Sequence, residues 1–171
     1  PLGRHMSGYI PIDLSTHCNT GASIPGTDQK IPTGAQRFRG LPFQLGGESK
    51  TVVAFGRGQI EQPLVIPVNA SARYLIFAHR LLDSRVLKEP CVGDHIADYK
   101  FHLAGGIELS ASIRDRLEIA VVPSSWGQMA MLAMSDQFDN LYPRFSGKFA
   151  DTGFRQTEAQ QGLVKDFYLW E

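Results

Sequence analysis

The stretch Ile96–Val122, IADYKFHLAGGIELSASIRDRLEIAVV, decides the fold class. A strand sends successive side chains to opposite faces of its sheet, so apolar residues at every second position predict strands with one buried face. Ala104-Gly105-Gly106 and Arg114-Asp115-Arg116 interrupt the alternation and suit tight turns. We therefore predict three consecutive antiparallel strands. Their alternating apolar positions are Tyr99, Phe101 and Leu103, then Ile107, Leu109, Ala111 and Ile113, and finally Leu117, Ile119 and Val121.

The other apolar runs are short and are bounded by glycine, proline and polar residues, as strands joined by turns are. No run has the length and period of an ordinary helix, and Pro11 and Pro67 place two runs at a sheet edge or a bulge. Many short strands of this kind predict an all-β domain, and we expect an antiparallel jelly-roll β-sandwich. The remaining predicted strands are Tyr9–Leu14, Phe38–Leu45, Thr51–Phe55, Leu64–Val68, Arg73–His79, Met129–Met134 and Leu163–Trp170.

The length of the chain indicates one domain, and its charge argues against nucleic-acid binding. The chain has 171 residues, which suits one domain with a sizeable core. Residues 1–6, PLGRHM, resemble the remnant of an expression tag, so we expect one β-sandwich domain over residues 7–171, excised from a larger protein. Lys plus Arg and Asp plus Glu number 17 each, which argues against a general nucleic-acid binder. No apolar run reaches the roughly 18 residues of a membrane span, so we expect no membrane partner.

The cysteines and acidic residues give no clear metal motif. Cys18 and Cys91 are the only cysteines, and they are either two free thiols or one disulfide closing a long loop. Asp13, Asp28 and Asp94 could contribute to a structural calcium site, although the chain has no EF-hand-type loop. We therefore expect no cofactor, with structural calcium as the open alternative.

Several short motifs follow one another in a recognisable order. They are Pro32-Thr33-Gly34, Phe38–Phe43 (FRGLPF), Tyr74–His79 (YLIFAH), Val92-Gly93, Tyr99, Gly105-Gly106 and Trp126. Over Tyr9–Met134 this order resembles the galactose-binding-like β-sandwich domains appended to bacterial polysaccharide-degrading enzymes. Those domains often show a PTG…F.G.PF segment, an LYFLH-like strand and a VG.Y…Y.DG hairpin ahead of a tryptophan. Here Gly105-Gly106 stands in place of the usual Asp-Gly.

The resemblance implies a non-catalytic, carbohydrate-binding or ancillary module in an extracellular or periplasmic setting. Its partners would be a polysaccharide or oligosaccharide and a neighbouring catalytic domain of the parent chain. Such a module raises the local concentration of that catalytic domain on the polymer. Two alternatives stay open: an interdomain or assembly module without its own ligand, and a small β-sandwich carbohydrate-active enzyme, either a lyase or a glycosidase.

Sugar binding needs an aromatic face and a few oriented polar groups. Trp126, which Gly127 follows, is predicted at a loop tip, and the long polar stretch after Asp136 contains further aromatics. Tyr168 and Trp170 are also expected near the surface, as is Phe145. The alternative is that Trp126 and Tyr142 cap the core beneath the loops. The predicted ligand-binding residues are Trp126, Tyr142, Asp139, Asn140, Arg144 and Arg80.

Catalysis is the main competing hypothesis. Polysaccharide lyases on β-sandwiches can use Tyr, His and Arg on one face, and Tyr99, His102, His79 and Arg80 supply those types. Parity places Tyr99 and His102 on opposite faces of one strand, which weakens their pairing as acid and base. His79 is more simply a hydrogen-bonded core histidine. The chain has no nucleophile-elbow, P-loop or dinucleotide-binding motif, so we predict no catalytic residue.

Overall fold

The computed structural model describes residues 8–24, 28–56, 58–85, 89, 92–123, 128–137 and 164–171. The chain divides into two compact units, one ending at Arg73 and one beginning at Tyr74. The described residues form short strands and one 3-10 turn, and none of them lies in an α-helix, so the predicted all-β class is confirmed. The expectation of a single domain over residues 7–171 stays a prediction.

Among its described residues, the first unit contains a hairpin formed by β1 (Ala35–Phe38) and β2 (Leu41–Gln44). The pair Phe38↔Leu41 closes it over Arg39 and Gly40, whose φ angles are 48° and 80°. Positive φ at both central residues is the geometry of a type I′ turn, which glycine adopts without strain. The prediction of one interrupted strand over Phe38–Leu45 is therefore wrong, because the chain reverses at Gly40.

Three predicted strands of the first unit form no ladder. Val52 and Phe55 make only isolated bridges, and Tyr9–Leu14 and Leu64–Val68 form no strand. Proline removes ladder donors in the last two segments, and the apolar side chains of Ile10 and Val65 are 87% and 75% exposed. Sequence period alone thus does not make a strand, because a ladder also needs a partner strand, and none pairs with these segments among the described residues.

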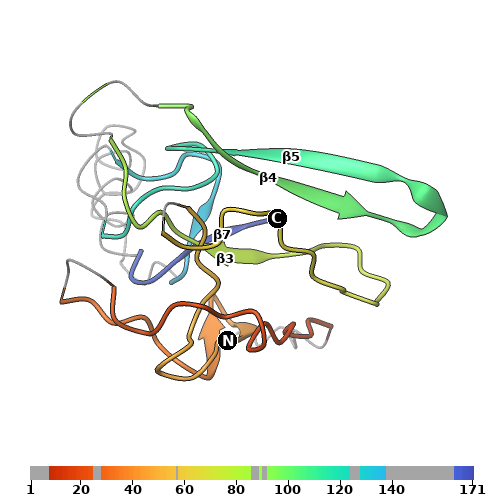
Figure 1. Cartoon of the computed structure of the whole chain (residues 1–171), viewed down its shortest axis with the longest axis horizontal. Helices are drawn as coiled ribbons and strands as arrows, with labels where there is room; N and C mark the ends of the chain where they lie inside the picture. Colours follow the sequence, from red (N-terminus) through yellow and green to blue (C-terminus); the bar gives the residue numbers. More distant parts are fainter. Residues whose placement is uncertain are drawn as a thin grey trace, which may run out of the picture. The chain divides into compact units, whose positions relative to one another are not determined.

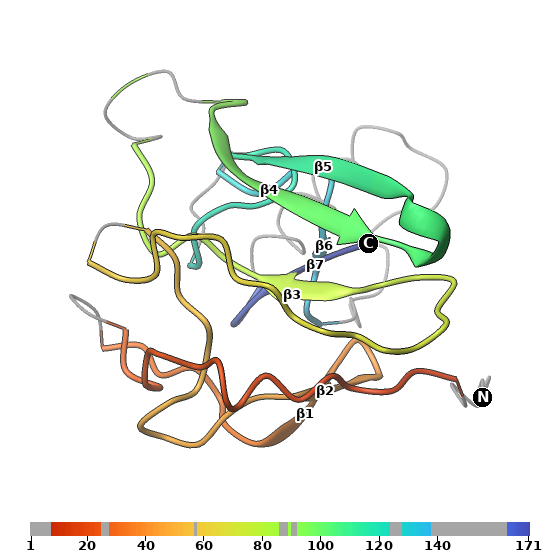
Figure 2. The same ribbon diagram turned by 45° about the vertical axis from the view of Figure 1, so that its right-hand side comes forward.

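The second unit contains a small sheet of order β3-β7-β6, in which both pairings are antiparallel. The strands are β3 (Phe77–His79), β7 (Tyr168–Trp170) and β6 (Met134–Ser135). The first two are shorter than predicted, and of the predicted strand Met129–Met134 only Met134 lies in a strand. The central β7, drawn in blue in Figures 1 and 2, is the most buried, with Tyr168 and Leu169 each 1% exposed. The carboxylate of Asp136 accepts the backbone N–H groups of residues 165–167 and so holds the chain just before β7.

The hairpin β4–β5 is the longest element of the second unit (Figure 1). It consists of β4 (His95–His102), the 3-10 turn η1 (Ala104–Gly106) and β5 (Glu108–Arg114), with Tyr99 opposite Ala111. Gly105 and Gly106 have φ angles of 79° and 77°, so the turn uses the left-handed freedom that Gly-Gly predicts. The first two strands of the deciding stretch are confirmed.

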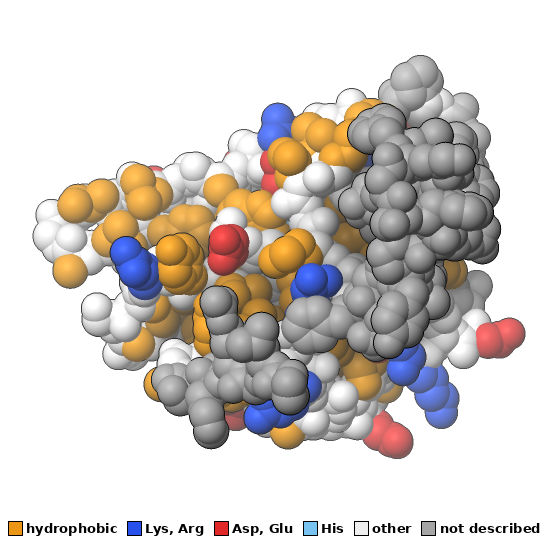
Figure 3. Space-filling model, turned by 180° about the vertical axis from the view of Figure 1, so that it is seen from behind, with side chains coloured by type: hydrophobic (Ala, Val, Ile, Leu, Met, Phe, Trp, Pro, Cys, Tyr) orange, Lys and Arg blue, Asp and Glu red, His pale blue; other side chains and the backbone are white. Residues whose placement is uncertain are grey.

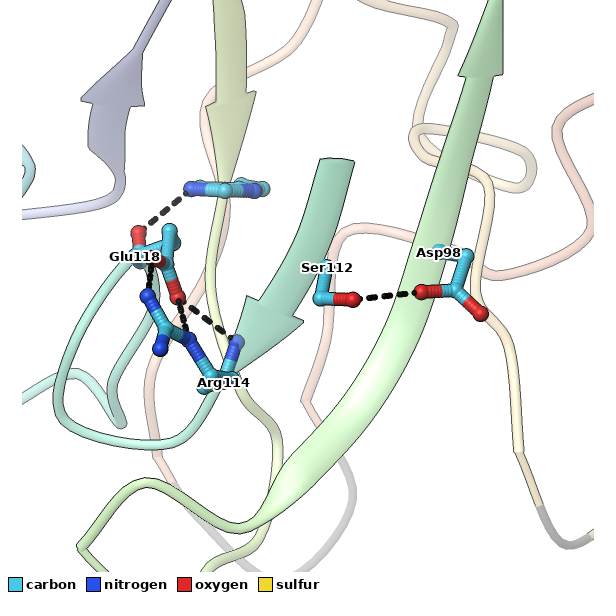
Figure 4. A network of polar contacts seen from close by, with 5 residues as sticks. Asp98, Ser112, Arg114 and Glu118 are labelled. Atoms are coloured by element: carbon cyan, nitrogen blue, oxygen red, sulfur yellow. Dashed lines mark hydrogen bonds and ion pairs between the residues drawn. The ribbon is translucent and has the colours of Figure 1, made fainter. Parts of the chain in front are cut away.

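The predicted third strand over Leu117–Val121 is wrong. Arg114 is held to Glu118, whose carboxylate accepts its backbone N–H at 2.9 Å, its Nε at 3.1 Å and its Nη2 at 2.5 Å (Figure 4). Arg116 has a φ of 65°, and the backbone N–H of Ile119 returns to the carbonyl of Arg114. The alternating apolar residues here therefore lie in a turn and not in a strand. The segment makes only isolated bridges, Asp115↔Ile119 within the turn and Leu81↔Val121 after it.

Two apolar clusters lie among the described residues of the second unit. One gathers Ala120, Val122, Ala130, Val164 and Tyr168. The other has Leu81, Ile113 and Ile119 at its centre, with half-buried side chains of β4 and β7 packed against it. The second cluster joins the hairpin to the three-stranded sheet.

Candidate functional site

A cluster of aromatic rings lies where β3, β4 and β7 meet, and we call Phe77, Tyr99, Phe101 and Trp170 the aromatic cluster. Register places Phe77 opposite Trp170 in the small sheet, and parity places Tyr99 and Phe101 on one face of β4. The centroid of the Phe77 ring lies 4.6 Å from that of Tyr99, 6.1 Å from Phe101 and 5.8 Å from Trp170. Tilted and edge-to-face arrangements at these spacings are favourable beyond simple burial.

The four rings are only half-buried, and the surface continues from them along the hairpin. Leu109 lies opposite Phe101, and the hairpin ends in Leu103 and Ile107, so these side chains share the face of the aromatic cluster. Leu103, Ile107 and Leu109 are 47%, 56% and 54% exposed. Hydrophobic side chains are visible along the projecting hairpin at the left of Figure 3. The molecule thus presents a ring-rich face with an aliphatic extension.

His79 contacts two members of the aromatic cluster, Tyr99 and Trp170. Its Nε2 lies 2.9 Å from the carbonyl oxygen of Glu118, so Nε2 carries the proton, and its Nδ1 accepts the hydroxyl of Tyr99 at 3.0 Å. The imidazole also stacks on Trp170 at 6.4 Å. Burial lowers the pKa of His79 from 6.5 to about 4, against the weaker opposing effect of Glu118. His79 is therefore a neutral, hydrogen-bonded core histidine, as predicted.

The same geometry bears on catalysis. Burial raises the pKa of Tyr99 to about 12, so the phenol stays protonated at neutral pH and serves as a donor. His102 lies on the other face of β4, where its Nδ1 is 3.1 Å from the carboxylate of Glu108. The structure brings Tyr99 and His79 together but separates them from His102. A general base needs a pKa near the working pH, and neither member of the buried pair has one.

Arg80 lies near the acidic residues Asp136 and Asp166, close to the start of β7. Its guanidinium donates to the backbone carbonyls of Asp166, at 3.3 Å, and of Val122. Burial lowers the pKa of Arg80, and the nearby Asp166 and Asp136 oppose that change. Burial also raises the pKa of Asp166, and the charge of Asp136 raises it further. Arg80 thus helps to hold β7 in place, while its predicted contact with a ligand stays a prediction.

Five of the predicted ligand-binding residues lie outside the described residues: Trp126, Asp139, Asn140, Tyr142 and Arg144. Phe145 lies outside them as well. Of the two other aromatics expected near the surface, Tyr168 is buried, which corrects that expectation, because it belongs to the central strand. Trp170 is half-buried and belongs to the aromatic cluster.

The candidate calcium residues do not form a group among the described residues. The carboxylate of Asp13 accepts the backbone N–H of Ser15 at 2.8 Å, which lowers its pKa. Asp94, in the other unit, lies 2.7 Å from the guanidinium of Arg85. The described part of the chain contains no cluster of three or more His, Cys, Asp or Glu side chains arranged for a metal ion.

Cys18 is a free, buried thiol whose sulfur lies 3.3 Å from the carbonyl of Leu14. Burial raises its pKa, and Asp13 adds to that effect. For Cys18 this agrees with the free-thiol alternative, whereas Cys91 lies outside the described residues.

Comparisons with protein families, with curated proteins and with solved structures found no match. The resemblance to galactose-binding-like domains therefore stays a prediction. Among the described residues, no helix has the length and apolar character to cross a membrane.

Sequence reasoning missed the aromatic cluster as a unit. Period two in β4 does place Tyr99 and Phe101 on one face. The signal that Phe77 and Trp170 join them is the pairing of β3 with β7, in which the paired residues Phe77 and Trp170 are 93 positions apart in the sequence. Such a pairing leaves no local trace in the sequence.

Proposed function

We propose that this chain is a non-catalytic carbohydrate-binding or ancillary module of an extracellular or periplasmic polysaccharide-degrading protein. We propose further that its finer architecture is a galactose-binding-like jelly-roll sandwich. The antiparallel pairings of the second unit are compatible with that architecture. In support, side chains of the hairpin pack on side chains of the small sheet through Tyr99 and Trp170, in the way that two sheets of a sandwich share one core.

The observation that carries the proposal is the half-buried aromatic cluster. A pyranose ring has an apolar face that stacks on aromatic side chains, and rigid rings already in mutual contact lose little entropy on binding. Phe77, Phe101 and Trp170 belong to three different strands, so their positions are set by backbone pairing. The pKa values of His79, about 4, and of Tyr99, about 12, lie far from neutral pH, which favours a binding role over acid–base catalysis by this pair.

An interdomain module is the second candidate, and a different observation favours it. Leu103, Ile107 and Leu109 extend the apolar face, and aliphatic side chains suit a protein surface better than a sugar. Both candidates use the same hairpin face, so an experiment must separate ring stacking from general apolar contact.

The experiment is retention of the 171-residue chain in native gels that contain single polysaccharides, run over a broad panel. Phe101→Leu keeps an apolar side chain but removes the ring, so we expect retention on the bound polysaccharide to fall about fivefold or more. Leu132→Ala is the matched control, because Leu132 is 58% exposed and lies outside the aromatic cluster. Trp126→Ala and Tyr142→Ala test the two aromatic residues predicted from the sequence.

Failure of the unmodified chain to bind any polysaccharide of the panel would contradict the carbohydrate role. Equal retention of the Phe101→Leu variant and the unmodified chain would show that the aromatic cluster is not the binding surface. Release of soluble sugar by the isolated chain would instead support the small-enzyme alternative.

A further inference from the structure

The outer edge of β5 has no neighbouring strand among the described residues. The hairpin is a two-stranded sheet, and both ribbon views draw β5 on its outside (Figures 1 and 2). An unpaired edge presents a row of backbone N–H and C=O groups that another strand can use. Two-stranded hairpins are also only marginally stable alone, so additional pairing is favourable.

The register identifies which backbone groups face outward. Leu103 donates its N–H to Ile107 at the hairpin end, and hydrogen-bonded pairs alternate along an antiparallel ladder. Residues 109, 111 and 113 therefore point their backbone groups at β4, and residues 108, 110, 112 and 114 point theirs outward. Arg114 agrees with this parity, because its N–H reaches Glu118 and its carbonyl accepts from Leu117. Outward groups of Glu108, Ser110 and Ser112 remain along the edge.

The sequence of β5, ELSASIR, is nearly symmetric about Ala111. On either side of Ala111 come first a serine, then an aliphatic residue and then a charged residue, negative on one side and positive on the other. Antiparallel pairing with an identical strand, centred on Ala111, sets Ser110 opposite Ser112 of the second copy. It also sets Leu109 opposite Ile113, and Glu108 opposite Arg114. Side chains of directly opposed residues share one face, so apolar groups meet apolar groups and opposite charges meet.

We infer that β5 pairs with β5 of a second copy, so that two hairpins form one continuous sheet about a two-fold axis at Ala111. Ser110 of one copy exchanges N–H···O hydrogen bonds with Ser112 of the other, and the reciprocal pair does the same. Such an interface is isologous, since the same strand of each copy supplies both sides.

The charges and exposed fractions of the β5 side chains are consistent with pairing to a second copy. The side chains of Glu108 and Arg114 are 54% and 41% exposed, so both can reach a second copy. Glu118 occupies the Nε and Nη2 of Arg114, and a guanidinium has five donors in all. Leu109 is 54% exposed, so its side chain is also available to a second copy.

The register and the choice of strand are both specific. Only centring on Ala111 sets Glu108 opposite Arg114, because the two residues are equally distant from it. On the other edge, β4 has an irregular register between His95 and Ala97 and places the charged Lys100 in mid-strand. Bulges and lysines protect sheet edges from pairing, whereas the middle of β5 is uncharged Ser-Ala-Ser.

Sedimentation equilibrium of the full chain over a concentration series tests the dimer. One strand edge per copy is a small interface, so we expect a weak, concentration-dependent dimer. Glu108→Arg sets arginine opposite arginine at both ends of the paired strands and is expected to weaken the dimer about tenfold or more. Lys100→Arg, which keeps the charge on the other strand, is the control and leaves association unchanged.

A mixing experiment tests the register. Arg114→Glu, made together with Glu118→Gln to avoid like charges within one chain, sets glutamate opposite glutamate in its homodimer. Mixed with the Glu108→Arg chain, it restores opposite charges at both ends, so the mixture is expected to associate more tightly than either variant alone. Circular dichroism establishes that each variant is folded.

A cross-link tests the axis without altering charge. In a chain with Cys18 and Cys91 replaced by alanine, Ala111→Cys places two identical residues opposite each other, within reach of a disulfide under mild oxidation. Ser110→Cys is the control, because its counterpart lies diagonally, about 8 Å away and beyond disulfide geometry. A dimeric band from Ala111→Cys alone supports the pairing.

The inference is overturned by a chain that stays monomeric at all concentrations and gives no Ala111→Cys cross-link. It is equally overturned by a dimer that persists unchanged in Glu108→Arg, which would place the interface elsewhere. If the Arg114→Glu chain does not fold, the cross-link and its control decide the question.

Discussion

The inner and outer halves of the hairpin β4–β5 carry the same alternating pattern but have different surroundings. In the inner half, Ala97, Tyr99 and Ile113 pack against Leu81, Ile119 and Trp170. In the outer half, Leu103, Ile107 and Leu109 are 47%, 56% and 54% exposed. The opposite face carries mostly polar side chains, with Asp98 bonded to Ser112 (Figure 4) and His102 beside Glu108. Sequence period therefore sets which face is apolar, and the neighbouring sheet sets how much of that face is covered.

The largest difference between the halves is expected in stability. Ile113→Ala removes a side chain that is 1% exposed, and the resulting cavity is expected to cost about 2 to 5 kcal/mol of unfolding free energy. Leu109→Ala, on the same strand and face, is expected to cost less than about 0.5 kcal/mol. Urea denaturation at low protein concentration measures both. Equal costs would mean that the outer half is covered in solution even in the monomer.

The fold class and the hairpin were predictable because alternation and Gly105-Gly106 are local signals. The turn at Arg114–Glu118 was not, because its apolar residues alternate as a strand does, and an ion pair over four residues closes it. The aromatic cluster was only half predictable. Tyr99 and Phe101 share a face by parity, whereas Phe77 and Trp170 reach them through a pairing of distant segments. Long-range pairing also explains why β7 is buried although its aromatics look exposed in sequence.

The pH dependence of stability is expected to differ between the buried His79 and the exposed His102. The pKa of His79 is about 4 in the folded chain and 6.5 without the fold, so the unfolded chain binds more protons between these values. The stability that depends on neutral His79 is therefore fully present above pH 6.5 and is lost as the pH falls towards 4. The loss is roughly 3 kcal/mol for a shift of this size. His79→Gln, which does not titrate, is expected to remove this part of the pH dependence.

The control for His79 is His102→Gln, in the exposed outer half. Urea midpoints of both variants at several pH values between 7 and 4 measure the difference, since carboxyl groups titrate alike in both. Asp166 acts in the opposite sense, because its raised pKa gives stability that is present at low pH and lost as the pH rises. A slope that is unchanged by His79→Gln would mean that His79 is solvated and protonated normally.

The hydrogen bond between Tyr99 and His79 is expected to have a smaller effect. Tyr99→Phe keeps the ring contacts with Phe77 and Trp170 but removes the donor to Nδ1 of His79. We expect a cost of about 1 to 2 kcal/mol, since a buried acceptor loses its partner. Tyr9→Phe, at a residue 41% exposed, makes the same chemical change and is expected to cost less than about 0.5 kcal/mol. If the two variants were equally stable by urea denaturation, the hydroxyl of Tyr99 would contribute nothing specific.

The smallest effect on the folded monomer is expected for Glu108→Gln. Glu108 and His102 form an exposed pair, 54% and 67% exposed, and such pairs contribute less than about 0.5 kcal/mol. Denaturation at low concentration should therefore find no change, while sedimentation at high concentration should find weaker association, because Arg114 of the second copy loses its counter-charge. Unchanged monomer stability together with weaker association is the result expected if the outer half of the hairpin functions in association, because its residues then contribute little to the stability of the monomer. A Glu108→Gln chain that is clearly destabilised as a monomer, with unchanged association, would assign Glu108 to the hairpin itself and remove it from the dimer.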